Sequence, residues 1–403
     1  MPDQGQYRIA MLAPPWLPVP PPGYGGIESV VALLCDGLLR RGHDVTLFAA
    51  PGSRSTATVR TVLPACYPDR IERALHEADH VARVFDAVDR AAASGRPYDV
   101  IHDHCGFTAF AMADRVATPL VHTLHGTFTE DTSDFYSYHA RKATAVAISA
   151  SQRAAAPAAL QIAAIIPNPI DVGSWPLCTQ KRNYLLWVGR MTKEKGPHRA
   201  IAAARSAGVP LILAGPVQPG QESFFRREVE PHIDGTTVQY VGEIGGARKR
   251  RLFAQARGLL MPIRWPEPFG MVMIEALSCG TPVVTFAEGA ATEIVQHGVT
   301  GYVVADETEM AAAIPALSGL DPAACRRAAE DRFGVDQVTR SYEQVYAHAT
   351  THAGSQPVPS PPARPGLKTL PAPRPMTAHA VPLNSSAVPS VDLPAPTPPR
   401  AGR

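Results

Sequence analysis

Two glutamates stand eight positions apart in the segment RWPEPFGMVMIEALSCG, residues 264–280. The prolines of RWPEPFG disfavour a helix before Phe269, whereas MVMIEALSC favours a helix that ends at Gly280. Glu267 is therefore expected in a loop after a strand, and Glu275 about 8–9 Å along the helix axis. Carboxylates separated in this way suit two ends of an extended ligand, where each can accept hydrogen bonds from hydroxyl groups.

The expected start of this helix, at Phe269, Gly270 and Met271, lies between the two glutamates. Free backbone amides and the helix dipole favour a phosphate at such a place, and a glycine lets the backbone approach it closely. A phosphate with hydroxyl groups on both sides is the outline of a nucleotide sugar.

A second group of charged residues follows an apolar run in YLLWVGRMTKEKGPHRA, residues 184–200. Arg190 and Lys195 are expected at the carboxyl end of a strand, and Pro197 favours a helix start. Two such cations can clamp a diphosphate and stabilise it as a leaving group. A solvated basic loop is the other interpretation that this stretch alone allows.

Glycines also precede an expected helix in GYGGIE, residues 23–28. Their amides could reach an anion or a sugar ring. The pattern is neither G-x-G-x-x-G nor a Walker A motif, so it favours neither a dinucleotide site nor an ATP site.

Short apolar runs alternate with helical patterns through most of the chain. RIAMLA, a helical pattern that Gly42 ends, and HDVTLFAA form a strand–helix–strand unit, which is typical of a parallel sheet. Further strands are expected in two series, at 99–104, 119–125, 145–149 and 163–168, and then at 184–189, 209–215, 236–242, 258–263, 281–286 and 301–305.

The proline-rich, polar segment over residues 167–183 is interpreted as a linker between these two series. The pattern predicts an α/β protein with two doubly wound, Rossmann-like domains that face each other across a cleft, where ligands bind beyond the carboxyl ends of the strands. The predicted parts are an acceptor-binding domain over 1–170, a nucleotide-sugar-binding domain over 171–335, a helix over 336–352 that packs back on the first domain, and a disordered Pro/Ala-rich tail over 353–403.

The composition narrows the class of protein further. The 403 residues are 45% apolar and carry a formal net charge of +2, which argues against a nucleic-acid binder. Six scattered cysteines without a CxxC pair predict reduced thiols in a cytoplasmic protein. The basic run RKRR at 248–251 is interpreted as a solvated helix face, and a peripheral contact with an anionic membrane is the alternative.

Taken in order along residues 8–346, these motifs resemble the retaining glycosyltransferases of family 4, which have the GT-B fold. The resemblance is carried by GGIE near the start, HGTF at 125–128, IPNPID at 166–171, GRMTKEKG at 189–196 and the E-x7-E pattern EPFGMVMIE at 267–275. It implies a nucleotide-sugar donor, with UDP or GDP expected, a hydroxyl acceptor on a glycan, lipid or small molecule, no metal and no further cofactor.

The resemblance also implies roles for individual residues. Arg190 and Lys195 correspond to the family's cations on the diphosphate, in the motif that begins at Gly189. Glu275 corresponds to the carboxylate on the ribose, and Glu267 to the one near the donor-sugar hydroxyls.

Three further positions carry implied roles in the first domain. His125 corresponds to a cleft histidine near the donor sugar, and Gly25 and Gly26 correspond to the glycine loop near the phosphates. Two features depart from the family pattern: Pro169 stands where the linker motif usually has glycine, and the proline-rich loop over 14–22 is long.

Other interpretations stay open at this point. His102 and His104 alternate on one strand, so they could form a metal site with His125, although a packed His102 and a cleft-lining His104 fit the pattern better. A nucleotide-sugar epimerase, a sugar phosphorylase and a non-catalytic sugar-nucleotide-binding protein are the alternatives to a transferase.

Overall fold

The computed structural model describes residues 5–23, 25–71 and 73–352, which contain two parallel β-sheets. The first sheet has the strand order β3-β2-β1-β4-β5-β6-β7. Its strands are β1 (Arg8–Leu12), β2 (Asp44–Phe48), β3 (Thr58–Arg60), β4 (Val100–Asp103), β5 (Leu120–Thr123), β6 (Thr144–Ala147) and β7 (Ile162–Ile165).

The second sheet repeats this plan with the order β10-β9-β8-β11-β12-β13. Its strands are β8 (Leu185–Val188), β9 (Leu211–Ala214), β10 (Val238–Tyr240), β11 (Gly258–Met261), β12 (Val283–Phe286) and β13 (Gly301–Val304). Each expected strand run overlaps an observed strand, and β3 is an additional, largely exposed strand of three residues.

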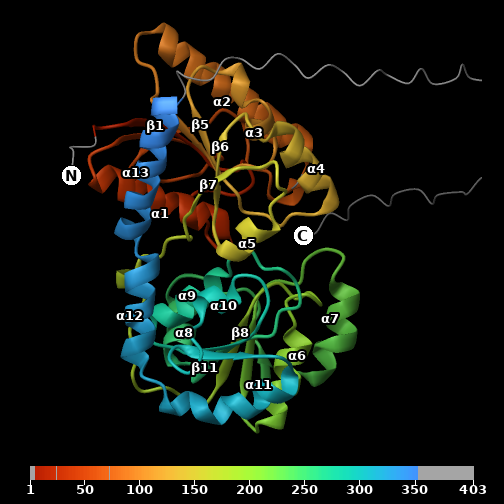
Figure 1. Cartoon of the computed structure of the whole chain (residues 1–403). Coiled ribbons are helices and arrows are strands. Elements are labelled where there is room, and N and C mark those ends of the chain that lie inside the picture. The colour runs from red at the N-terminus through yellow and green to blue at the C-terminus, as the bar shows by residue number, and fades with distance from the viewer. Residues whose placement is uncertain (1–4, 24, 72, 353–403) are drawn as a thin grey trace, which may run out of the picture. The chain divides into compact units, whose positions relative to one another are not determined.

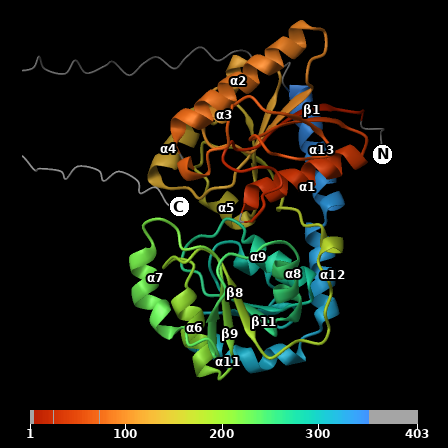
Figure 2. The same ribbon diagram turned by 180° about the vertical axis from the view of Figure 1, so that it is seen from behind.

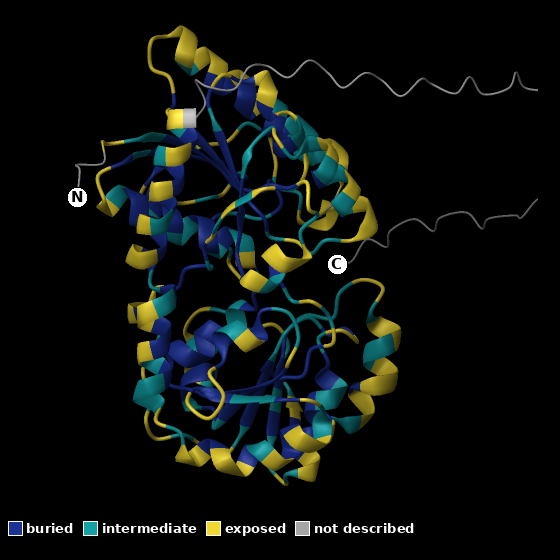
Figure 3. Ribbon diagram, in the orientation of Figure 1, coloured by how far each residue is buried: buried dark blue, intermediate teal, exposed yellow. Residues whose placement is uncertain are grey.

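Helices connect the strands and cover the sheets (Figure 3). In the first half they are α1 (Gly26–Arg40), α2 (Ala74–Ala93), α3 (Thr108–Ala111), α4 (Glu130–His139) and α5 (Ala150–Ala155). In the second half they are α6 (Pro197–Ser206), α7 (Glu222–Glu228), α8 (Gly246–Gln255), α9 (Met271–Ser278), α10 (Ala291–Ile294) and α11 (Glu307–Ala313), followed by α12 (Pro322–Phe333) and α13 (Val335–His352).

The chain passes between the halves twice, and the two passages lie together. Ile170 N donates a hydrogen bond to Phe333 O at 2.8 Å, and Ile170 also forms a bridge with Gly334. Helix α12 packs on α9 of the second half, whereas α13 packs on α1 of the first half, as Figures 1 and 2 show from opposite sides.

Helix α13 contributes a complete apolar stripe to the core of the first half. Val338, Tyr342, Val345, Tyr346 and Ala349 recur at helical spacing and are buried in one cluster with strand residues of the first sheet. Burial of two tyrosine rings there stabilises the attachment of α13, since a large buried side chain contributes about 1.5–3 kcal/mol. The hydroxyl groups are also paired, Tyr342 with Thr123 Oγ1 at 2.9 Å and Tyr346 with His102 Nδ1 at 2.7 Å.

A buried carboxylate fixes the same helix to the first half. Glu343 accepts hydrogen bonds from Arg41 Nε at 2.5 Å and Arg41 Nη2 at 2.7 Å, and it pairs with His43 Nε2 at 2.8 Å. Burial alone would raise the pKa of Glu343, but the bonds from Arg41 and His43 outweigh burial and lower that pKa below 4.5. His43 therefore serves as an anchor for α13.

The described residues include no helix long and apolar enough to cross a membrane. The predicted tail over 353–403 lies outside the described residues.

Candidate active site

The strands β8 and β11 are neighbours in the second sheet. The basic loop that follows β8 lies against the loop that follows β11. Arg264 N donates to Glu194 O at 2.9 Å, and Arg199 Nη1 donates to Lys193 O at 3.1 Å and to Pro262 O at 3.2 Å. Gly196 has a φ of +74°, and a Cβ there would strike the carbonyl of Pro262. Gly196 thus permits the loop after β8 and the loop after β11 to approach each other closely.

This approach brings Lys195 to Glu267. Lys195 Nζ forms an ion pair with Glu267 Oε2, and the same oxygen accepts a hydrogen bond from Trp265 Nε1 at 2.9 Å. The ammonium also lies 4.6 Å from the centre of the Trp265 ring. With side-chain exposures of 17% and 12%, the cation and the carboxylate are both largely removed from water but still accessible.

Arg190 keeps hydrogen-bonding capacity in the same loop. Its Nη1 donates to Gln218 Oε1 at 3.3 Å, whereas its Nε is buried and has no hydrogen-bond partner among the residues described. The adjacent Gly189 is held against the end of β9, because Gly189 N donates to Ala214 O at 3.0 Å. An unpaired buried donor costs free energy, so an anion that reaches Arg190 would be bound favourably.

Helix α9 begins between the two predicted glutamates. Gly270 is its N-cap with a φ of +92°, and a Cβ there would lie 2.7 Å from Met273 Cε. The Phe269 side chain is 3% exposed and packs in the core, so the backbone at this position, and not the ring, is what can face a ligand. Met271, the first helical residue, packs against the cores of both halves.

Glu275 lies on α9 with one oxygen paired and one free. Its side chain is buried at 8% exposure, and Oε1 accepts a hydrogen bond from Lys249 Nζ at 2.7 Å. Its Oε2 is buried and has no hydrogen-bond partner within the described part of the chain. An orphaned carboxylate oxygen of this kind is a ready acceptor for a ligand hydroxyl.

The interpretation of residues 248–251 as a solvated face is wrong for Lys249. Its side chain is 26% exposed and is directed to Glu275, because α8 packs beside α9. Sequence reasoning missed this residue, since a run of four basic residues gives no signal that distinguishes the inward one.

The glycine loop of the first half meets the loop after β10 of the second half. A Cβ on Gly245 would lie 3.2 Å from Pro22 O and 3.8 Å from Gly23 Cα. Gly25 is the N-cap of α1, and a Cβ there would lie 2.6 Å from Pro21 Cβ, whereas the space around Gly26, the first helical residue, is open.

His125 follows β5, and a chain of contacts links it to the loop that holds Glu267. Gln152 Nε2 donates to Gly126 O at 2.8 Å, next to His125, and Gln152 lies on α5. The Glu293 carboxylate, from the second half, accepts hydrogen bonds from the first amides of α5, Ala150 N and Ser151 N, at 2.7 Å each. Glu293 follows Ala290, whose N donates to Glu267 O at 3.0 Å.

Glu293 lies in the first turn of α10. Its role at the start of α5 was not predicted, because the two segments are 142 residues apart. The carboxylate stabilises the positive end of a helix that belongs to the other half of the protein.

The histidines in β4 and directly after it are buried. His102 and His104 both have 0% exposure, so the expectation that His104 lines an open cleft is wrong. His104 Nδ1 is 2.9 Å from His125 Nε2. No group of three or more histidine, cysteine, aspartate or glutamate residues with the geometry of a metal site occurs among the residues that the structure describes.

Residues 24–173 match the family described as Glycosyltransferase Family 4, and residues 177–328 match Glycosyl transferases group 1. The chain belongs to the family 4 glycosyltransferases. The two matches divide the enzyme at the linker between the two sheets.

Relatives of this glycosyltransferase extend over most of its length. It is 28% identical to a glycogen synthase of Mycobacterium tuberculosis (strain CDC 1551 / Oshkosh), over 82% of this chain and 91% of the relative. It is also 28% identical to the solved structure of a glycosyltransferase involved in avilamycin A biosynthesis, with a TM-score of 0.62 over 86% of this chain and 98% of that one.

A more distant solved structure shares the fold. It is HepE of Anabaena in complex with UDP-glucose, at 20% identity and a TM-score of 0.64, over 85% of this chain and all of that one. The prediction of two doubly wound α/β domains with the GT-B fold is therefore confirmed.

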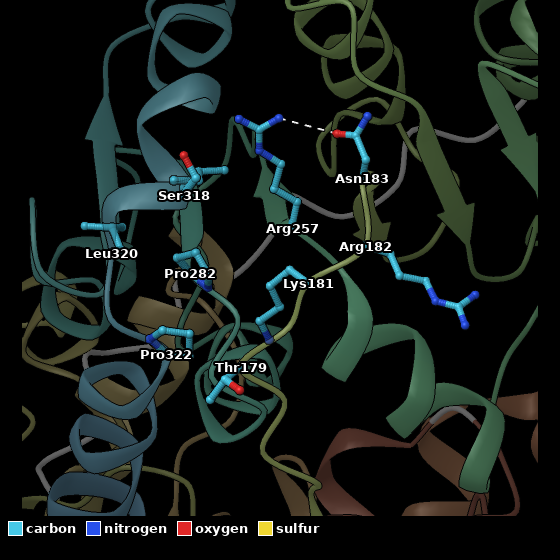
Figure 4. A pocket seen from close by; sticks show the side chains of 10 residues that line it. Thr179, Lys181, Arg182, Asn183, Arg257, Pro282, Ser318, Leu320 and Pro322 are labelled. Carbon is cyan, nitrogen blue, oxygen red and sulfur yellow. Dashed lines mark hydrogen bonds between the residues drawn. The ribbon is translucent and has the colours of Figure 1, made fainter.

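The glycosyltransferase has a pocket of about 350 Å³ away from these residues. Figure 4 shows Lys181, Asn183, Arg257 and Pro282 in its wall. They lie just before β8, β11 and β12, at the amino edge of the second sheet, whereas the predicted donor residues follow the carboxyl ends of β8 and β11. Lys181 Nζ is already bonded to Ala254 O, Cys279 O and Thr281 Oγ1, whereas Arg257 Nε is buried and has no hydrogen-bond partner among the described residues.

Proposed function

We propose that this glycosyltransferase moves a sugar from a nucleoside diphosphate sugar to an acceptor hydroxyl with retention of anomeric configuration. The observation that carries the proposal is the arrangement around the start of α9. Lys195 is paired with Glu267 in the loop before this helix, and within the helix Glu275 is bonded to Lys249 through Oε1 and keeps a buried, unpaired Oε2.

In this proposal the diphosphate lies at the amino end of α9. Arg190 Nε and Lys195 Nζ neutralise it, and they stabilise the charge that develops as the sugar leaves. The backbone at Gly189 and Gly270 lets the phosphates approach closely. Because Lys195 is paired with Glu267, the donor provides a second anion to a cation that is already positioned.

The two carboxylates orient the parts of the donor on either side of the phosphates. Glu275 Oε2 accepts hydrogen bonds from the ribose hydroxyls, since it is the oxygen without a protein partner. Glu267 accepts from hydroxyls of the transferred sugar, and its loop is fixed by Ala290 N. This placement reduces the freedom of the donor before reaction.

Retention is proposed from the E-x7-E pattern of Glu267 and Glu275, which resembles that of retaining family members. In the same-face displacement that we propose, the bond from the anomeric carbon to the phosphate oxygen breaks and the bond to the acceptor oxygen forms on the same face. The departing phosphate oxygen takes the proton of the acceptor hydroxyl. Arg190 and Lys195 supply the positive charge that this reaction needs, so we expect turnover to be unchanged by a chelator such as EDTA.

The donor nucleotide is proposed to be UDP or GDP. HepE of Anabaena, which shares the fold, was solved with UDP-glucose, and this makes UDP the first nucleotide to test. The acceptor is a hydroxyl group of a glycan, a lipid or a small molecule. A cytoplasmic location, with contact at the inner face of a membrane, stays a prediction from the sequence.

A thermal-shift panel with UDP, GDP, ADP and TDP and their sugars tests the donor site. We expect one nucleotide series to raise the melting temperature of the wild type, and the rise to vanish in Lys195→Ala and in Glu275→Ala. Lys142→Ala is the matched control, because Lys142 contacts Ala111 and Asp114 in the first half. A wild type that responds to no nucleotide, or site variants that respond as Lys142→Ala does, would contradict the proposal.

Release of nucleoside diphosphate in the presence of an acceptor then separates transfer from other activities. An epimerase would convert the nucleotide sugar to its epimer without an acceptor. A non-catalytic binding protein would show a rise in melting temperature with the nucleotide but no turnover.

A further inference from the structure

Two histidines of the first half form a hydrogen-bonded pair at the carboxyl ends of β4 and β5. His104 follows β4 and His125 follows β5, which is its neighbour in the sheet. His104 Nδ1 and His125 Nε2 are 2.9 Å apart, and the rings are stacked with their centres 5.2 Å apart. His104 is fully buried, whereas His125 is partly exposed.

Both rings are neutral at ordinary pH. Burial lowers the pKa of His104 well below 6.5, and burial together with nearby His122 lowers the pKa of His125 to about 3. A neutral imidazole has one N–H donor and one bare nitrogen acceptor. One of the two facing nitrogens must therefore carry the proton of the bond and the other must accept it.

The far nitrogen of His104 decides between these two arrangements. His104 Nε2 is buried and has no hydrogen-bond partner in the described part of the chain. If His125 donated, His104 would have to accept at Nδ1 and would keep an unpaired N–H at Nε2 inside the protein. If His104 donates from Nδ1, the buried Nε2 is a bare acceptor, which is less costly to leave unpaired than a donor.

We infer that His104 is a positioning residue: it donates from Nδ1 to His125 Nε2 and thereby holds His125 in the tautomer that presents Nδ1–H to an oxygen of the donor sugar. The hydrogen bond at one ring nitrogen sets the protonation of the other. No described residue forms a hydrogen bond with His125 Nδ1, so this donor is available to a ligand.

The inference rests on the proposed function for the identity of the ligand, and it limits the mechanism. A His125 whose Nδ1 already carries a proton cannot accept the proton of the acceptor hydroxyl there. His125 therefore binds the sugar, and proton transfer is left to the departing phosphate oxygen.

Nitrogen-15 NMR of the full chain with labelled histidine tests the tautomer without any ligand. The spectra distinguish protonated from bare ring nitrogens, and His104→Asn and a conservative substitution at His125 assign the signals. We expect His125 to be protonated at Nδ1 and His104 at Nδ1. A His125 protonated at Nε2, or a His104 protonated at Nε2, would overturn the inference, whether or not the protein binds nucleotides.

A pair of variants tests the consequence for catalysis. The side-chain NH2 of asparagine can take the place of His104 Nδ1–H, whereas leucine cannot donate. In hydrolysis of the donor sugar, we expect His104→Leu to lower kcat/KM by roughly tenfold and His104→Asn to stay within about twofold of the wild type. His139→Leu on α4 is the matched control for loss of a histidine, and it should leave the rate unchanged.

The nucleotide response keeps this test separate from that of the proposed function. Apart from the backbone at Gly25 and Gly26, the residues expected to bind the nucleotide lie in the second half, so folded His104→Leu should keep the thermal shift with nucleotide. Equal loss of activity in His104→Leu and His104→Asn, or no loss in folded His104→Leu, would contradict the positioning role. A wild type without a nucleotide response would instead contradict the proposed function.

Discussion

The two halves of this glycosyltransferase hold their polar side chains in different ways. In the second half, Lys195 pairs with Glu267 and Lys249 pairs with buried Glu275, and the members of both pairs lie on loops and helices of the same half. In the first half, His102 and Glu343 are buried, and they take part in the attachment of α13, a helix that comes from the other end of the chain. The first arrangement suits exchange with a ligand, and the second suits a fixed frame.

This difference predicts which property each substitution changes. Changes to the charged pairs of the second half should affect ligand binding and turnover more than stability. Changes at the contacts of α13 should affect the free energy of unfolding with little effect on nucleotide affinity. The substitutions below test this division, in order of decreasing effect.

Lys195→Ala should have the largest effect. It removes a cation that we place on the leaving diphosphate, and loss of one such electrostatic contact costs about 10²–10³-fold in rate. Steady-state release of nucleoside diphosphate measures it, with Lys142→Ala as the control. A rate within threefold of the wild type would remove Lys195 from the reaction.

Glu343→Ala should lower the free energy of unfolding by about 3 kcal/mol, because it leaves Arg41 and buried His43 without their carboxylate. Denaturant unfolding measures this value. The matched control is Asp336→Ala on the same helix: the Asp336 pair with Arg40 is exposed, and such a pair contributes less than about 1 kcal/mol. Equal effects of the two substitutions would contradict the account of α13.

The wild type should also lose the contribution of Glu343 at low pH. The pKa of Glu343 is lowered in the folded protein, so the unfolded state takes up its proton first as the pH falls. The stabilisation is complete above the ordinary value of 4.5 and is lost as the pH decreases through the folded pKa. Denaturant unfolding of the wild type and of Glu343→Ala, measured from neutral to acidic pH, should show that the difference between their free energies of unfolding decreases as the pH falls.

Lys249→Ala should weaken nucleotide binding by roughly tenfold, since it removes the partner that orients Glu275 and leaves a buried carboxylate unpaired. Calorimetric titration with the preferred nucleotide measures the change. Arg251→Ala, an exposed position in the same basic run, is the comparison. If Lys249→Ala and Arg251→Ala bind the nucleotide with equal affinity, Lys249 does not support the ligand site and acts as part of a solvated helix face.

Tyr346→Phe should have the smallest effect, a loss of about 1 kcal/mol in unfolding free energy, because it removes the hydroxyl that pairs with buried His102. Nucleotide affinity should stay that of the wild type. A fall in nucleotide affinity without a change in stability would show that the contacts of α13 and the ligand site are not independent.

The sequence was most informative about the site where two adjacent strands are each followed directly by a recognisable motif. The strands β8 and β11 are adjacent in the sheet, and each is followed directly by a motif, so Lys195 and Glu267 could be expected together. The expected strands were found because buried parallel strands are continuous apolar runs. Strand β3 was missed, since three half-exposed residues have no periodicity to detect.

What the sequence could not show depends on long-range packing. His104 was expected to line the cleft, but it is fully buried beside His102, with the ring centres 4.2 Å apart. His102 in turn bonds Tyr346, which is 244 residues away from it in the chain. The inward direction of Lys249 depends on how α8 packs on α9, and the contact of Glu293 with α5 depends on how the halves meet. Patterns within one segment carry no information on these contacts.

A crystal structure with the nucleotide that most raises the melting temperature tests the central claim directly. We predict that the diphosphate lies at the amino end of α9 within hydrogen-bond reach of Arg190 and Lys195, and that the ribose hydroxyls bind Glu275 Oε2. A nucleotide bound instead at the amino edge of the second sheet, beside Lys181 and Arg257, would contradict it.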